Sequence, residues 1–289
     1  MSSLAIKLFL LYTIHIMCRR WIVKKTITVL LVVAFTFILC SCSSTNKVLE
    51  NLAVTTAPIQ TISITFPEGL TAPEYGQLLE ENGVCSQADF LEAVNNPSPD
   101  LTCIPEIGNA DERPFLLEGY LFPDTYEFER SASPQIVLKT MLTNFNRHIT
   151  EDMRSRAAVL GYTIDEILRI ASVIQEEATS PEMKKVSSVL HNRLNTKNGK
   201  LECDVTVFYL EKYVKPYVED VSVYSEKYNA YKCIGLPAGP ITNVGVEAIE
   251  AALYPADTDY YFFLTDEDGG FHYAVTWSEH SANVKKYCK

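Results

Sequence analysis

Hydrophobic and polar positions follow a helical spacing most clearly between residues 163 and 194. Thr163 followed by Glu166 predicts a capping-box start, in which the hydroxyl and the carboxylate satisfy free N–H groups of the first helical turn. Apolar residues then recur at helical spacing: Ile167, Leu168, Ala171, Ile174 and Ala178. Ser180 and Pro181 predict the start of a second helix, whose apolar positions are Met183, Val186, Val189, Leu190 and Leu194.

One carboxylate of the first helix lies at the edge of its apolar face. At about 100° per residue, Glu176 points away from the apolar stripe, whereas Glu177 lies on its shoulder, near Ile170 and Ile174. A carboxylate held against apolar neighbours has a reason to be protonated near neutral pH. A glutamate near a helix end is more often simply solvated, so the pattern alone leaves the role of Glu177 open.

The chain before this helix pair predicts a small α+β module and a longer helix. Residues 62–66 alternate as a strand does, and residues 74–82 and 86–94 have helical character. The aromatic-rich and turn-rich stretch 116–128 is interpreted as a loop. Ser133 and Pro134 start a helix that leads towards Gly161.

The chain after the helix pair returns to mixed structure. Residues 235–241 form a loop whose glycines and prolines fix the backbone. Residues 246–253 predict a helix, residues 260–264 and 271–276 a hairpin closed by Asp268-Gly269-Gly270, and residues 278–287 a last helix. The predicted fold class is therefore α+β.

The first 42 residues predict a membrane anchor or a lipoprotein signal. Arg19, Arg20, Lys24 and Lys25 precede an uncharged apolar run of about 14 residues, 27–40, which is short for a helix that spans a bilayer. Residues 39–42 resemble a lipobox, with Cys42 as the lipidated cysteine. Both alternatives place the body on the extracytoplasmic side of the cell membrane, joined by a polar tether at residues 43–61.

Charge and motif content exclude several classes of function. A formal net charge of −11 argues against nucleic acid as a partner. The five histidines show no metal-binding spacing, and no phosphate-binding or nucleotide-binding glycine motif is present, so neither a metal nor a cofactor is expected. Cysteine pairing stays open between two disulfides and free thiols; the disulfides would be Cys85–Cys103 and Cys203–Cys233.

Several segments together resemble the endolytic murein transglycosylase family, also called YceG-like. The resemblance runs from about residue 62 to the C-terminus. It is carried by EGYLFPDTYEF (118–128), ASVIQEEA (171–178), VLHNRL (189–194) and YNAYKCIGLPAGPITNVG (228–245). The resemblance implies a LysM-like module at residues 62–108 and a mixed α/β catalytic domain at residues 109–289. It also implies that Glu177 is the catalytic acid.

The family's chemistry implies the remaining expectations. A lytic transglycosylase cleaves the β-1,4 bond from N-acetylmuramic acid to N-acetylglucosamine and leaves a 1,6-anhydro end, so it needs one carboxyl group where ordinary glycosidases need two. Peptidoglycan glycan strands would be the substrate and cell-wall synthases possible partners. Six further residues are candidates for substrate binding: Glu118, Asn192, Asp204, Thr206, Asn229 and Tyr231.

The chain departs from the family pattern in its loops. Residues 201–206 read LECDVT where LQxDPT is usual, and 235–241 read GLPAGPI where GLPPGPI is usual. These departures affect loop geometry and substrate preference and leave the reaction class intact. Two other functions remain open. One is a catalytically silent peptidoglycan-binding scaffold of the cell-wall synthesis machinery. The other is a true hydrolase, which needs a second carboxylate such as Glu118, Asp124 or Asp204.

Overall fold

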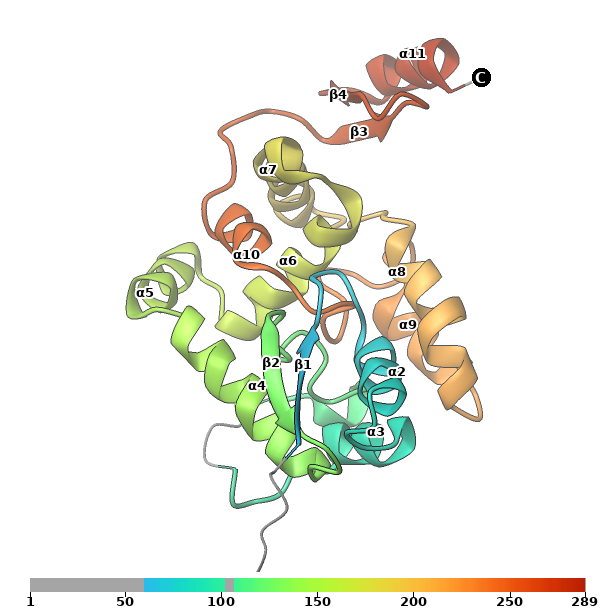
Figure 1. The fold of residues 1–289 in the computed structure, drawn as a ribbon. Coiled ribbons are helices and arrows are strands. Elements are labelled where there is room, and N and C mark those ends of the chain that lie inside the picture. Colours follow the sequence, from blue (N-terminus) through green and yellow to red (C-terminus); the bar gives the residue numbers. More distant parts are fainter. Residues whose placement is uncertain (1–59, 102–106, 289) are drawn as a thin grey trace, which may run out of the picture. The chain divides into compact units, whose positions relative to one another are not determined.

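A computed structural model describes residues 60–101 and 107–288 of the chain (Figure 1). The predicted anchor, Cys42 and the tether up to residue 59 lie outside the described residues. Within the described residues, no helix combines the length and apolarity needed to cross a membrane.

The first strand pairs with a strand far along the chain. Strand β1 (Thr61–Thr65) runs antiparallel to β2 (Thr125–Glu129), from Thr61 opposite Glu129 to Thr65 opposite Thr125 (Figure 1). Helices α2 (Ala72–Glu81) and α3 (Gln87–Asn95) lie between them in sequence. The interpretation of residues 116–128 as a loop is therefore wrong for β2, and this pairing crosses the predicted domain boundary at 108/109. The LysM-like module itself stays a prediction.

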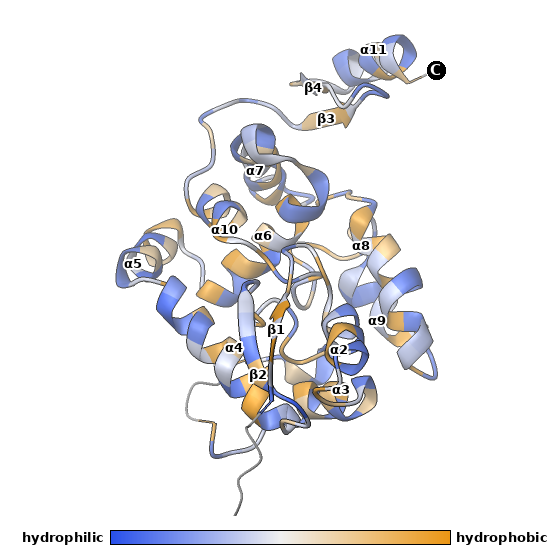
Figure 2. Cartoon of the chain, viewed as in Figure 1, coloured by the Kyte–Doolittle hydropathy of each residue, from blue (hydrophilic) through white to orange (hydrophobic). Residues whose placement is uncertain are grey.

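The hydrophobic core is continuous through the described residues and centres on buried helices. It is formed largely by α4 (Pro134–His148), α6 (Ile164–Glu177), α7 (Met183–Leu194) and α10 (Val246–Leu253), with α5 (Glu151–Leu160) beside α6 and α10. Ile167, Ile170 and Ile174 of α6 are completely buried, as the helical spacing predicts. In Figure 2, α3, α4 and α10 each carry a hydrophobic and a hydrophilic side.

The predicted capping-box start of α6 at Thr163 is confirmed, whereas the predicted start of α7 at Ser180 differs in the structure. At α6, the Thr163 hydroxyl accepts a hydrogen bond from Glu166 N at 3.2 Å, and the Glu166 carboxylate accepts from Thr163 N at 2.8 Å. Residues Ser180–Glu182 instead form a separate turn of 3-10 helix before α7. The Ser180 hydroxyl donates to Glu247 and does not cap α7.

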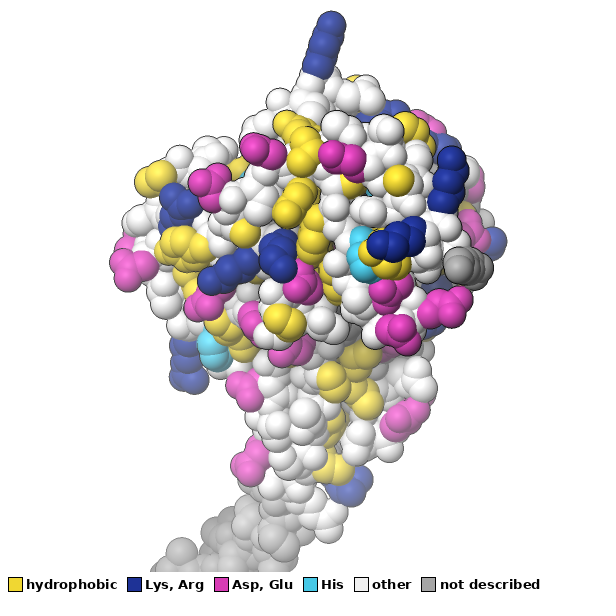
Figure 3. All heavy atoms as spheres, turned by 90° about the horizontal axis from the view of Figure 1, so that it is seen from above, with side chains coloured by type: hydrophobic (Ala, Val, Ile, Leu, Met, Phe, Trp, Pro, Cys, Tyr) yellow, Lys and Arg dark blue, Asp and Glu magenta, His cyan; other side chains and the backbone are white. Residues whose placement is uncertain are grey.

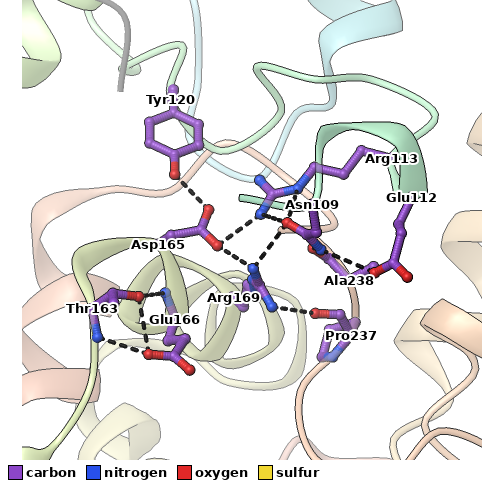
Figure 4. Close-up of polar contacts among 10 residues, drawn as sticks. All are labelled: Asn109, Glu112, Arg113, Tyr120, Thr163, Asp165, Glu166, Arg169, Pro237 and Ala238. Atoms are coloured by element: carbon purple, nitrogen blue, oxygen red, sulfur yellow. Dashed lines mark hydrogen bonds and ion pairs between the residues drawn. The ribbon is translucent and has the colours of Figure 1, made fainter. Parts of the chain in front are cut away.

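A buried ionic cluster fixes the start of α6 (Figure 4). The Asp165 carboxylate forms ion pairs with Arg113, at 2.7 Å, and with Arg169. It also accepts a hydrogen bond from the Tyr120 hydroxyl at 2.5 Å. Asn109, which accepts from Arg113, donates to Ala238 O at 2.7 Å. The cluster therefore ties residues 109–120, α6 and the loop after residue 235 together.

One glycine allows two of these loops to meet. Gly119 has φ +84°, and a Cβ atom there would lie 2.5 Å from the Pro240 side chain. Neither the backbone angle nor the space suits a larger residue. The loop 115–121 and the loop 235–245 can therefore pack directly against each other.

The segment after α7 has an unusual helical geometry. Helix α8 (Val205–Phe208) continues into a π-helical stretch (Tyr209–Val214) and a 3-10 turn (Lys215–Tyr217), followed by α9 (Ser222–Tyr228). A further 3-10 turn occupies Ala110–Glu112. The sequence pattern predicted none of these short elements. Wide helical turns of this kind occur frequently at functional sites.

The C-terminal residues form a hairpin and a helix that contact α7. Strands β3 (Phe262–Thr265) and β4 (Phe271–Ala274) pair antiparallel, and α11 (Trp277–Tyr287) follows. The predicted hairpin is confirmed. Asn192 of α7 donates to Thr258 O and Tyr260 O at 2.8 and 2.9 Å, so α7 fixes the segment that leads into β3.

The described cysteines carry free thiols. Cys85, Cys203, Cys233 and Cys288 are all unpaired, so the Cys203–Cys233 disulfide is wrong. Cys203 is completely enclosed, with its sulfur 3.4 Å from Leu201 O. Cys103, the expected partner of Cys85, lies outside the described residues.

Candidate active site

Glu177 lies in the wall of a cleft of about 1000 Å³. The end of α6, the loop 202–204, α8, strand β3 and α11 all contribute to the lining. Figure 3 views the molecule from above, so that the end at which Figure 1 draws β3, β4 and α11 faces the reader. A stripe of hydrophobic side chains crosses this face, with charged side chains on both sides. An open, partly apolar cleft with a few polar groups is the usual form of a ligand site.

The position of Glu177 follows from where α6 stops. It is the last residue of the helix, and Ala178 has extended backbone angles. Burial is the largest influence on the Glu177 carboxyl and, together with the charge of Asp204, raises its pKa to about 7, although a hydrogen bond from Cys203 and the charge of Arg193 act in the opposite direction. Near neutral pH the carboxyl group can therefore both donate and accept a proton.

The Cys203 thiol has one proton to donate and lies beside two acceptors. It lies against Glu177 and within reach of Leu201 O. Burial and the neighbouring Glu177 carboxylate raise the pKa of Cys203 well above its usual value, so the thiol stays protonated as a donor. The sequence showed this residue only as a departure from the family's loop pattern.

Two predicted substrate-binding residues lie in the cleft and contact each other. The Tyr231 hydroxyl donates to Asp204 Oδ1 at 2.7 Å, and both side chains line the cleft with Glu177. Asn229 supports Tyr231 because its Oδ1 accepts from Tyr231 N at 2.9 Å. Asp204 is thus the one of the three candidate second carboxylates that lies with Glu177.

The other predicted residues hold the scaffold. Thr206 is fully buried and donates to Cys203 O at 2.9 Å while accepting from Ala230 N at 3.0 Å. Asn192 fixes the segment before β3, as described above. Neither these two nor Asn229 lines the cleft.

Glu118 lies away from the cleft in a completely buried position. It accepts hydrogen bonds from Ala72 N at 2.9 and 3.0 Å and from Asn243 Nδ2 at 3.0 Å. Burial raises its pKa to about 8. Glu118 therefore connects the start of α2 to the loop at Asn243. Asp124, the remaining candidate carboxylate, is exposed and accepts from Asn144 Nδ2 at 2.8 Å.

Exposed aromatic side chains border the cleft. Trp277 is 67% exposed and Phe208 63% exposed, and both line it. Trp277 packs edge-on against Phe262, which also stacks on His280. Arg193 lies over the Phe262 ring at 5.5 Å and donates to Tyr261 O at 2.6 Å. Sequence reasoning missed Phe262, Trp277 and Arg193 because only the placement of the hairpin against α7 brings them to Glu177, and it missed Phe208 because the short helix α8 was not predicted.

The cleft contains no recognisable metal centre. Among residues 60–101 and 107–288, no group of three or more His, Cys, Asp or Glu side chains is placed to hold a metal ion. The chemistry available to these residues is proton transfer by Glu177, with hydrogen bonding by Tyr231 and Asp204.

A sequence model described as the YceG-like family matches residues 19–286. The chain belongs to the YceG-like family. A crystal structure of a yceG-like protein from Listeria monocytogenes superposes with a TM-score of 0.65 at 29% identity, covering 79% of this chain and 76% of that one. The predicted family and the α+β fold class of a YceG-like protein are both confirmed.

Curated relatives of this YceG-like protein share one name. A protein named endolytic murein transglycosylase from Bacillus subtilis (strain 168) is 38% identical over 175 residues, covering 59% of this chain and 48% of the relative. A protein with the same name from Streptococcus pneumoniae (strain D39) is 28% identical over 251 residues, covering 78% of this chain and 44% of the relative. The chain therefore spans about half the length of the curated relatives it matches.

Proposed function

We propose that this protein is a lytic transglycosylase that cleaves peptidoglycan glycan strands internally, with Glu177 as the one carboxyl group that gives and takes protons. The single observation that carries the proposal is the position of Glu177, whose pKa is raised to about 7 in the wall of a cleft of about 1000 Å³. The names of the curated relatives support the same reaction class.

The reaction needs one group that first gives and then takes a proton. Protonated Glu177 donates to the oxygen between N-acetylmuramic acid and N-acetylglucosamine, and the muramic C1–O bond breaks. The resulting carboxylate then accepts the proton of the muramic C6 hydroxyl while O6 bonds to C1. A 1,6-anhydro ring forms, no water is consumed and Glu177 returns to its protonated state.

Neighbouring residues suit the charge that develops in this reaction. Bond cleavage gives the sugar oxocarbenium character, which nearby carboxylates and aligned oxygen dipoles stabilise. Asp204 would be the carboxylate in this role, supported by its position in the cleft with Glu177 and by the hydrogen bond that it accepts from the Tyr231 hydroxyl. The exposed faces of Trp277 and Phe208 provide apolar surface for sugar rings.

The remaining parts of the proposal concern location and partners. An N-terminal anchor, by lipid at Cys42 or by a transmembrane helix, would hold the catalytic region on the extracytoplasmic side of the cell membrane. A LysM-like module built around β1, α2 and α3 would add contacts to glycan. Cell-wall synthases that extend the strands would be the protein partners, and cleavage would limit strand length.

Analysis of the products formed from isolated sacculi tests the function. Purified full-length protein should release fragments that end in 1,6-anhydromuramic acid. Reducing ends would instead indicate a hydrolase that uses Asp204 as its second carboxylate. Unchanged glycan would contradict catalysis and favour the scaffold role.

A further inference from the structure

A second cavity adjoins the catalytic cleft on the other side of α8. It has a volume of about 320 Å³ and shares Val205 and Phe208 with the cleft. Glu176, Lys212 and Tyr213 are among its lining residues. Glu176 and Glu177 are adjacent residues at the end of α6, so the two cavities share this helix end as well as Val205 and Phe208. A side branch of a ligand in the cleft would reach the second cavity past these shared residues.

The second cavity offers both signs of charge. The Lys212 ammonium donates to the Tyr213 hydroxyl at 2.7 Å and forms no ion pair with any described residue. The Glu176 carboxylate lies on the same cavity wall, over Gly69. Burial raises the pKa of Glu176, while a hydrogen bond from Thr242 and the charge of Lys212 favour its carboxylate. An ammonium group without an ion-pair partner suits a ligand carboxylate, and a carboxylate suits a ligand amine.

Tyr209 also lines this cavity. Its hydroxyl is buried and is influenced by Glu118, Tyr228 and Arg113, which do not line the cavity, so the ring and not the hydroxyl is assigned to the cavity wall. Tyr209 begins the π-helical stretch that continues through Lys212 and Tyr213, so the wide helical turn itself forms this wall.

We propose that this cavity binds the stem peptide attached to the muramic residue that Glu177 attacks. This assignment rests on the proposed function. In a peptide-bearing strand the sugars are uncharged, because the lactyl carboxyl group of each muramic residue is amide-linked to the peptide. The peptide itself carries carboxylates and, before cross-linking, a free amine on its diamino acid. Lys212 would bind a peptide carboxylate and Glu176 the amine. The enzyme would then select strands that bear uncross-linked peptides.

Paired substrates test the assignment. The full-length protein is assayed on glycan strands that bear peptides and on the same strands stripped of peptide by an amidase. The lactyl carboxylates that the amidase exposes are converted to amides, so that the stripped strands carry no charge. The wild type should show a higher kcat/KM on the peptide-bearing strands. Lys212→Ala should reduce that preference by roughly 3- to 10-fold, equivalent to about 0.7–1.4 kcal/mol. Lys139→Ala, an exposed lysine on α4, is the matched control and should keep the preference.

A second comparison assigns the amine contact. Acetylating the diamino acid's amine should lower wild-type turnover of peptide-bearing strands, and Glu176→Gln should make the enzyme insensitive to that acetylation. Equal wild-type turnover of peptide-bearing and stripped strands would overturn the proposal. So would an equal loss on both substrates in Lys212→Ala, because the cavity would then hold the sugar chain itself.

Binding measurements separate this proposal from the proposed function. In the Glu177→Gln background, calorimetry with peptide-bearing and stripped strands reports on the cavity without turnover. Preferential binding without any cleavage by the wild type would sink the transglycosylase function and keep the peptide site. Anhydromuramic products without preferential binding would support the transglycosylase function and overturn the peptide site.

Discussion

Glu176 and Glu177 are consecutive residues at the end of α6, yet they line different cavities. Glu177 faces the cleft of about 1000 Å³ and Glu176 the adjoining cavity of about 320 Å³. A rotation of about 100° along one helix separates the proposed catalytic group from the proposed peptide contact. The same substitution can therefore be made at each residue and the two variants compared, because both residues are glutamates at the end of the same helix.

Replacing Glu177 should abolish most turnover without unfolding the protein. Glu177→Gln keeps the size and hydrogen-bonding capacity of the side chain but removes its proton, and positioned acid–base groups typically contribute about 10²–10⁴-fold to rate. We expect a loss of that order in the release of anhydromuropeptides, with an unchanged melting curve. Glu176→Gln should cost far less on strands stripped of peptide, because its carboxylate faces the other cavity.

Two outcomes would contradict this assignment. If Glu176→Gln were the inactive variant, the orientation of the helix end would be wrong. If Glu177→Gln lost activity only by unfolding, Glu177 would be a structural residue.

The pH dependence of turnover should follow the Glu177 carboxyl group. Burial raises its pKa to about 7, and the acid step needs the protonated form, so kcat/KM should fall as the pH rises through about 7. Cys203→Ala removes a hydrogen bond that lowers this pKa, so the falling limb should move to higher pH. Asp204→Asn removes a charge that raises the pKa and should move the limb to lower pH.

The test depends on the direction in which the falling limb of kcat/KM moves and not on the height of the profile, because either substitution can also change the maximal rate. Tyr231→Phe serves as a control, since it removes the hydrogen bond to Asp204 and keeps its charge. Limbs that shift in the same direction in Cys203→Ala and Asp204→Asn would mean that another group controls the profile.

Local patterns predicted much of the fold and the central residue of the site. Glu177 follows from the helical spacing of Ile170 and Ile174, and the α6 capping box from Thr163 and Glu166, because these relationships span only a few residues. The β1–β2 pairing joins residues about 60 positions apart, so no local pattern shows it. The local pattern therefore predicts a loop where β2 forms.

The site residues that were missed depend on tertiary placement in the same way. Arg193 reaches the cleft because it donates to Tyr261 O, and Trp277 because α11 follows the hairpin. Glu118 is the opposite case, because the sequence predicts it to bind substrate whereas the structure buries it away from the cleft. Its motif is shared with the family, but a buried carboxylate next to the N-terminus of α2 has a structural use that the sequence pattern does not distinguish from binding.

The ionic cluster at Asp165 should dominate the stability of the α6 start. Removing one partner of a buried pair leaves the other charge uncompensated and costs about 3–5 kcal/mol, so Asp165→Asn should lower the free energy of urea unfolding by that order. Exposed Asp259→Asn should stay within about 0.5 kcal/mol. A loss below 1 kcal/mol for Asp165→Asn would contradict this role.

The stabilisation that Asp165 provides should decrease at acidic pH. Burial disfavours the Asp165 carboxylate, but the Arg113 hydrogen bond and charge, with the Tyr120 hydroxyl, hold its pKa below the usual value. A lowered pKa contributes stability above the unfolded value of about 3.9 and loses it as the pH falls through the folded value. The difference in unfolding free energy between wild type and Asp165→Asn should therefore shrink below about pH 4.

Lipidation of Cys42 remains a prediction from residues 39–42. If it occurs, cells should incorporate labelled fatty acid into the wild type, whereas Cys42→Ala should remain unlabelled and migrate as an uncleaved precursor. Cys40→Ala is the matched control and should still be labelled. An unlabelled wild type of the same mobility as Cys42→Ala would favour a transmembrane anchor.

Glu118 should make stability depend on pH in the opposite sense from Asp165. Burial raises its folded pKa to about 8, above an unfolded value of about 4.3. The folded state therefore holds one more proton than the unfolded state between these values. Stability from this group is fully present below about pH 4.3 and is lost progressively as the pH rises to about 8.

Glu118→Gln tests this directly because an amide resembles the protonated carboxyl group and does not titrate. Its oxygen can accept from Ala72 N and Asn243 Nδ2, as Glu118 Oε1 does. Unfolding by urea at pH 5, 6.5 and 8 should show the variant gaining stability relative to the wild type as the pH rises. Glu250→Gln, at an exposed position of α10, should show no such trend. A constant difference across this range would mean that Glu118 is already ionised at pH 5, held by the N–H groups it accepts from at the start of α2.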